Sequence, residues 1–204
     1  MNRVLAVFLC CIPFITWAQD IDWLTAEEYE KLYPTRATET IDSSEAEVIF
    51  WVNVVRQYPN KYYEEYLKPH FDTTDIPLFY TSSLIKTLRE AQTLHVLEHH
   101  PLLSEKAAEH AEYMGRRGKY GHDNYVKRST ELLEVFAGTA ENCNYAEPTP
   151  FRMVMSLLID ENVRNLGHRN TLLSKDYYFI GVAISDHKEA KFQCVQEFGG
   201  EILE

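Results

Sequence analysis

The sequence predicts an α+β domain in which helices pack on an antiparallel sheet. Apolar residues recur at helical spacing in several segments before residue 167, and the period changes to that of strands from residue 177 onward. Further strand-like pieces occur around residues 133–146. Helices that come first, followed by late strands without any internal repeat, are typical of the α+β class.

Residues 1–18 have the layout of a secretory signal peptide. A basic Arg3 precedes an apolar run from Val4 to Trp17, and the small residue Ala18 follows. The run is shorter than the roughly 20 apolar residues of a membrane-spanning helix. We therefore expect export to a periplasm, a cell surface or the medium, and no transmembrane segment in the mature chain. A lipid-anchored cysteine in this run is the alternative.

The mature chain is expected to contain a polar lead-in with little structure, 19–43, and one domain, 44–204. Apolar spacing, N-caps and terminating prolines or glycines predict four helices at 45–57, 83–99, 104–117 and 150–166. The start of the fourth helix has the clearest signal, because Thr149 is a good N-cap and Pro150 suits the first helical position. The proline-containing segment 60–82 is predicted as a loop-rich connection.

Two β-rich segments close the chain. YYFIGVAISD, 177–186, and KFQCVQEFG, 191–199, are joined by a short polar stretch, which predicts an antiparallel hairpin.

Composition excludes several classes of function. The net charge of -11 argues against nucleic-acid binding, which depends on Lys and Arg neutralising phosphates, and against adhesion to anionic lipid by charge. P-loop, GxGxxG, GxSxG, HExxH and CxxC motifs do not occur in the sequence. Kinase, dehydrogenase and common hydrolase functions therefore lack support.

Two cysteines, Cys143 and Cys194, remain once the leader is removed. In an oxidising compartment such a pair predicts a disulfide bond. The alternative is two buried thiols that act as small apolar side chains.

The residues that can carry chemistry lie in four short stretches: Gly121-His122, AENC at 140–143, Asp160-Glu161 and GHR at 167–169. Their order, together with AEHAEYM before them, an intervening Arg128, and NTLL and YFIGVAIS after them, resembles the CAP family (SCP domain). This is the family of cysteine-rich secretory proteins, antigen 5 and plant pathogenesis-related proteins, here in its compact microbial form. The resemblance covers about residues 44–199.

The resemblance implies an α-β-α sandwich with a central antiparallel sheet, and a cleft that holds two histidines and two acids. The corresponding residues are His122, Glu141 and His168, with the second acid on the helix before His168. The family pattern points to Asp160 as this acid, although the family usually has Glu there. Helical periodicity points instead to Glu161, which continues the apolar face.

Simpler roles remain open for the same residues. His168 after Gly167 suits a cation at a helix C-terminus, and Glu141 before an Asn suits a turn. His110 is expected to be a packed core histidine.

Two imidazoles with two carboxylates can bind a divalent metal such as zinc weakly, with His122 and His168 as the ligands. No nucleophile stands out. The sequence thus favours a secreted, non-enzymatic module that binds an extracellular protein, lipid or small ligand. The alternatives are a metal-dependent extracytoplasmic hydrolase, a binder of lipids or small hydrophobic molecules, and a purely structural role for the four side chains.

Overall fold

A four-stranded sheet lies at the centre of the computed structural model, which describes residues 21–34 and 41–204. Its strands are β1 (Glu98–His99), β2 (Thr139–Tyr145), β3 (Phe179–His187) and β4 (Lys191–Gly199), in the order β1-β3-β4-β2. β4 pairs antiparallel with β3 and β2, whereas the two-residue β1 runs parallel to β3. The predicted C-terminal hairpin is confirmed as β3 and β4.

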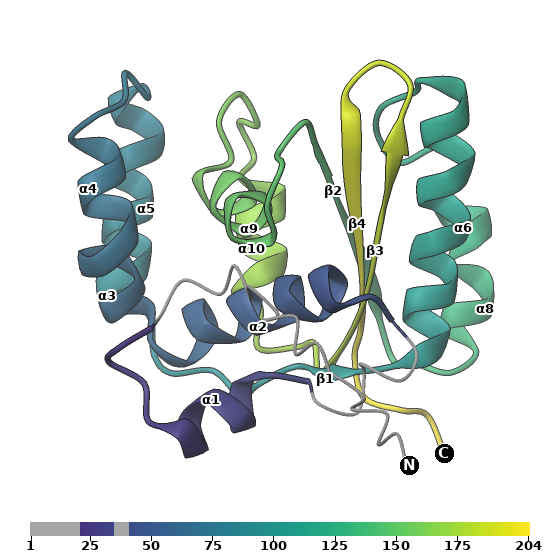
Figure 1. Ribbon diagram of the computed structural model, residues 1–204. Coiled ribbons are helices and arrows are strands. Elements are labelled where there is room, and N and C mark those ends of the chain that lie inside the picture. Colours follow the sequence, from purple (N-terminus) through teal and green to yellow (C-terminus); the bar gives the residue numbers. More distant parts are fainter. Residues whose placement is uncertain (1–20, 35–40) are drawn as a thin grey trace, which may run out of the picture.

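Helices cover both faces of this sheet (Figure 1). On one face α6 (Pro101–Arg117) contacts β3 and β4, and on the other α2 (Ser43–Gln57) contacts β3 while α9 (Pro150–Ile159) contacts β2. This arrangement confirms the predicted α-β-α sandwich. The remaining helical segments are α1 (Ala26–Leu32), α3 (Pro59–Tyr62), the π-helical turn η2 (Tyr63–Leu67), α4 (Lys68–Phe71), α5 (Leu78–Glu90), α7 (Tyr125–Arg128), α8 (Thr130–Leu133) and α10 (Gly167–Leu172).

The two faces of the sheet carry different cores. On the α2 face, Ile180 and Phe198 belong to a large cluster that includes Trp51 and Leu158. On the α6 face one cluster consists of small side chains, Ala107, Ala111, Cys143, Ala183 and Val195, and a second contains Leu103, Leu132 and Phe136. Because successive strand residues point to opposite faces, this split follows directly from the alternation in β3 and β4.

One predicted helix is too long. The segment 83–99 was predicted to be helical throughout, but α5 ends at Glu90 and the chain continues in extended form to β1. Buried polar side chains of α2 hold it there. The Asn53 side chain accepts a hydrogen bond from the Leu97 N–H at 2.8 Å and donates one to the Leu97 carbonyl at 3.1 Å. Arg56 donates to the His95 carbonyl at 3.1 Å. These long-range bonds override the local helical pattern.

Other boundaries also differ from the sequence predictions. The segment predicted as a loop-rich connection is helical in α3, η2, α4 and the start of α5, and the predicted lead-in contains α1. α6 begins at Pro101, three residues before Ser104. The fourth predicted helix ends at Ile159 and α10 follows as a separate helix. The predicted signal peptide lies outside the described residues. Among the described helices, none combines the length and apolar character needed to cross a bilayer.

Candidate functional site

His122 lies in the turn that follows α6. Gly118 ends the helix in the left-handed conformation, with φ of 62°, and Gly121 has φ of 97°, so two glycines make the turn possible. The Tyr145 hydroxyl accepts a hydrogen bond from the Gly121 N–H at 2.8 Å, which ties the turn to β2. In this position His122 Nδ1 lies 2.7 Å from Glu141 Oε1 on β2.

A second histidine–carboxylate pair forms where α9 meets α10. Asp160 caps the C-terminus of α9 with φ of 59°, and its Oδ1 lies 2.7 Å from His168 Nδ1. Its Oδ2 accepts from the Arg169 backbone N–H at 3.1 Å. Both carboxylate oxygens of Asp160 therefore hold the first turn of α10.

The two pairs face each other beside β2, the terminal strand of the described sheet. The ring centroids of His122 and His168 lie 6.3 Å apart. The carboxylates are buried, with side-chain exposures of 1% for Glu141 and 0% for Asp160, whereas the rings are 44% and 21% exposed. The structure thus brings His122, Glu141, Asp160 and His168 together, with the acids inside and the imidazoles toward the surface.

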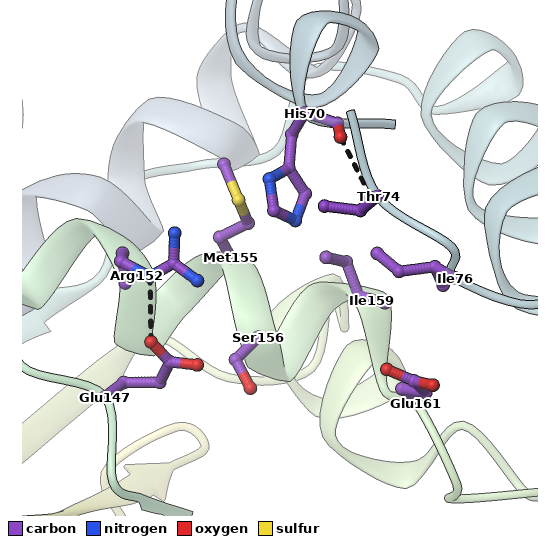
Figure 2. Close-up of a pocket in the computed structure, with 9 residues that line it drawn as sticks. All are labelled: His70, Thr74, Ile76, Glu147, Arg152, Met155, Ser156, Ile159 and Glu161. Carbon is purple, nitrogen blue, oxygen red and sulfur yellow. Dashed lines mark hydrogen bonds and ion pairs between the residues drawn. The ribbon is translucent and has the colours of Figure 1, made fainter. Parts of the chain in front are cut away.

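Glu161, the alternative to Asp160, lies elsewhere. Because α9 ends at Ile159, the helical periodicity that favoured Glu161 does not extend to that position. Its side chain is exposed and lines a different cavity, which also includes His70 and Arg152 (Figure 2). His168 occupies the first turn of α10 rather than a helix C-terminus.

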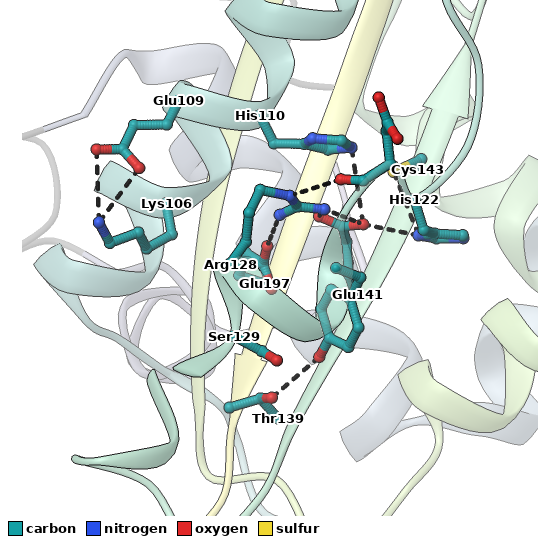
Figure 3. A network of polar contacts seen from close by, with 12 residues as sticks. Lys106, Glu109, His110, His122, Arg128, Ser129, Thr139, Glu141, Cys143 and Glu197 are labelled. Atoms are coloured by element: carbon teal, nitrogen blue, oxygen red, sulfur yellow. Dashed lines mark hydrogen bonds and ion pairs between the residues drawn. The ribbon is translucent and has the colours of Figure 1, made fainter. Parts of the chain in front are cut away.

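A buried charge network lies behind the first pair (Figure 3). Glu141 and Glu197 are directly opposite in the β2–β4 register, and Arg128 lies between them, 2.8 Å from Glu141 Oε2 and 3.2 Å from Glu197 Oε1. Burial and the neighbouring Glu141 raise the pKa of Glu197. Burial opposes ionisation of Glu141 too, but hydrogen bonds from His122 and Glu197 and the charges of His110 and Arg128 lower its pKa. The network therefore keeps Glu141 ionised beside a protonated Glu197.

This network predicts that Glu197→Gln stabilises the protein at alkaline pH. Between the ordinary carboxyl pKa and the raised value, folded Glu197 keeps a proton that the unfolded chain releases, so the free energy of unfolding falls as pH rises. Glutamine can donate to Glu141 without this cost. We expect a gain of about 1 to 3 kcal/mol at pH ~8 and none below pH ~4, measured by urea unfolding. The exposed Glu201→Gln is the control, and a Glu197→Gln protein less stable than the parent at pH ~8 would contradict the assignment.

The predicted Cys143–Cys194 disulfide is wrong. Both cysteines are free and buried. In the β2–β4 register Cys194 pairs with Asn144 and Cys143 with Val195. A one-residue offset places two side chains on opposite faces of a sheet, so Cys143 faces α6 and Cys194 faces the large core.

Sequence reasoning missed the partners of Glu141 that lie on the α6 face. Glu197 received no role, although its place opposite Glu141 follows from the strand register. His110 is buried as expected, but its Nε2 is also 3.7 Å from Glu141 Oε1. The signal for Glu197 is a glutamate among apolar residues in a strand, which becomes informative once β2 and β4 are known to be neighbours.

Comparisons with known proteins agree with this fold. The family model described as "CAP: Cysteine-rich secretory protein family" matches residues 83–198, more than half of the chain. No curated protein matches the chain.

Three solved structures are similar to the chain. An outer surface protein from Borrelia burgdorferi is 22% identical, with a TM-score of 0.45, over 61% of this chain and 90% of that one. An extracellular protein containing an SCP domain from Bacillus anthracis is 15% identical, with a TM-score of 0.48, over 87% and 44%. A cysteine-rich secretory protein from Staphylococcus aureus is 18% identical, with a TM-score of 0.40, over 63% and 41%. All three TM-scores are below 0.5, so the assignment of the chain to a family depends on the family model alone.

Proposed function

We propose, from the premise that the chain belongs to the cysteine-rich secretory protein (CAP) family, that it is an exported binding module whose paired histidines hold a divalent metal ion such as zinc. The proposed ligands are the Nε2 atoms of His122 and His168. Glu141 and Asp160 orient the two rings. The module binds rather than catalyses, and the metal gives it a point of attachment for an extracellular protein or a small ligand.

The observation that carries this proposal is the matched Nδ1 contact of both histidines. Each Nδ1 lies 2.7 Å from a buried carboxylate oxygen, which fixes the tautomer with the hydrogen on Nδ1. Each Nε2 then carries a lone pair, and no residue in the described part of the chain hydrogen-bonds to either Nε2. A carboxylate that accepts from the far nitrogen of an imidazole is the usual support of a zinc-binding histidine.

Ring spacing and charge also suit a metal. With Zn–N distances of about 2.0 to 2.1 Å, two imidazoles on one zinc have centroids about 5 to 6 Å apart, close to the 6.3 Å between His122 and His168. Glu141 and Asp160 supply two negative charges beside a dication. Two histidine ligands leave further coordination positions for water or for a ligand, so the ion is expected to bind weakly.

Export is supported by the leader, because residues 1–18 have the pattern of a signal peptide. N-terminal sequencing of the protein recovered from outside the cytoplasm is expected to begin after Ala18; recovery of the uncleaved Met1 form would contradict export through this leader.

Zinc titration by calorimetry tests the binding function. We expect saturable binding that is lost at this site in a His122→Ala/His168→Ala double variant and kept in a His70→Ala variant, because His70 lies beside the separate cavity of Figure 2. Circular dichroism checks that all three proteins are folded. Equal zinc binding by the parent and a folded double variant would overturn the proposed site.

Asp160→Asn tests the role of the orienting carboxylates. Asparagine tolerates the left-handed φ of 59° at this position, so the backbone of the turn is expected to persist. Asparagine lacks the negative charge that the Asp160 carboxylate places beside His168 Nδ1, and this loss is expected to weaken zinc binding by roughly 10- to 100-fold. The same calorimetric titration measures this change, and an unaltered affinity would show that Asp160 does not support the ligand.

A further inference from the structure

A second group of metal-ligating atoms lies on the α6 side of Glu141. One atom each from His110, Glu141 and Cys143 lies within 4.8 Å of the other two, and all three residues are buried. They come from α6 and from alternate positions of β2, whose side chains point to the same face of the sheet. Figure 3 shows them converging beside the His122 turn.

Two of these side chains also meet at one backbone oxygen. His110 Nε2 lies 3.0 Å from the Gly121 carbonyl oxygen, and Cys143 Sγ lies 3.7 Å from the same atom. His110 Nε2 is in addition 3.7 Å from Glu141 Oε1. With Zn–S of about 2.3 Å and Zn–N or Zn–O of about 2.0 to 2.2 Å, ligand atoms of a tetrahedral zinc lie about 3.3 to 3.8 Å apart. Three of the contacts are therefore close to the spacing within a zinc site, and the three side-chain ligand atoms all lie within 4.8 Å of one another.

A dication in this region would be balanced by the ionised Glu141 and by the thiolate that Cys143 becomes on binding it. Arg128 pairs with Glu141, and the neighbouring Glu197 keeps its proton. Burial lowers the pKa of His110, so its imidazole is neutral and can act as a ligand. Burial, followed by the charges of Glu141 and Glu197, raises the pKa of the Cys143 thiol. Without a metal this thiol stays protonated and unreactive, and a metal ion is the species that displaces its proton.

We infer that His110, Glu141 and Cys143 form a buried site for a thiophilic divalent metal ion, with zinc the fitting class, separate from the pair His122 and His168. A thiolate, an imidazole and a carboxylate are ligands that zinc accepts together. The Gly121 carbonyl oxygen is placed to complete four-coordination. An ion at this inner site would tie α6, the His122 turn and β2 together. It would therefore support the fold beneath the more exposed pair His122 and His168, the outer pair.

Cobalt(II) absorption in oxygen-free buffer tests this site, because only a cysteine ligand produces a thiolate-to-cobalt charge-transfer band in the near ultraviolet. We expect a saturable band in the parent protein that is lost in Cys143→Ser. Cys194→Ser is the matched control, since Cys194 is equally buried but faces the other core, and it is expected to keep the band. No band in the parent, or a band that persists in Cys143→Ser, would overturn the inference.

The two proposed metal sites can be tested separately. His168→Ala removes a ligand of the outer pair only and is expected to keep the charge-transfer band whether or not the outer site binds metal. Loss of the band in His168→Ala would contradict an independent inner site. X-ray absorption of the zinc-loaded parent protein needs no variant to fold. A sulfur contribution at about 2.3 Å to the average zinc shell is expected, and a shell of nitrogen and oxygen alone would contradict the inner site.

Discussion

Gly181→Ala is expected to destabilise the protein by about 3 to 5 kcal/mol, or to prevent folding. Gly181 is in β3, where α6 crosses the sheet. A Cβ at this position would overlap the backbone nitrogen of Ser104 and the carbonyl carbon of Leu103. Because those are helix backbone atoms, relief requires α6 to move away from β3 rather than one side chain to rotate. The packing of α6, and with it the position of the His122 turn, thus depends on a missing side chain.

Gly138→Ala is the matched control for this prediction. An added Cβ there has no atom within 4 Å, and its effect on the free energy of unfolding is expected to lie between zero and a gain of about 1 kcal/mol. Urea unfolding of both variants measures the difference. A Gly181→Ala protein as stable as Gly138→Ala would show that α6 and β3 are not so closely packed.

Arg169→Met is expected to cost about 3 to 5 kcal/mol and to disturb the second histidine–carboxylate pair. The Arg169 side chain is buried and donates to the carbonyls of Leu158 and Ile159 at 2.7 and 2.8 Å. It also donates to Ser83 Oγ at 2.9 Å and to the Tyr80 carbonyl at 3.3 Å. Methionine fills similar space but leaves these acceptors buried without a donor.

Arg164→Met, in the loop that precedes α10, is the control, because Arg164 is exposed; it is expected to change stability by less than about 0.5 kcal/mol. Thermal unfolding compares the two variants. The chemical shifts of the His168 ring report whether the contact with Asp160 persists. Equal stability of the two variants would contradict a structural role for the buried guanidinium.

The sequence was sufficient for the fold class and for elements with strong local signals. Thr149 and Pro150 begin α9 as predicted, and the late β-rich segments form the β3–β4 hairpin. Elements determined by distant contacts could not be predicted in this way. The segment after Glu90 has a helical pattern, but its extended form depends on buried side chains of α2, which lie about 40 residues earlier in the chain.

The candidate site residues were predicted from the order of their motifs rather than from local pattern. His122, Glu141 and His168 lie far apart in the sequence, and only the sandwich brings them together. The choice between Asp160 and Glu161 shows why periodicity failed. It assumed that α9 continues, whereas the chain turns at Asp160 with a positive φ that nothing in the apolar spacing indicates.

The inner cluster and the free cysteines depend on strand register. One residue of offset between β2 and β4 separates Cys143 from Cys194 and places Glu141 opposite Glu197. Cysteine count alone therefore predicted a bond that the sheet does not permit. The same offset directs Cys143 toward His110, which the sequence presented only as a core residue.

A crystal structure of the zinc-soaked protein, with anomalous scattering recorded at the zinc edge, tests the outer metal site most directly. We predict an anomalous peak about 2.0 to 2.1 Å from Nε2 of both His122 and His168, with Glu141 and Asp160 still bonded to the Nδ1 atoms. Ordered histidine rings at saturating zinc with no peak between them would contradict the proposed function.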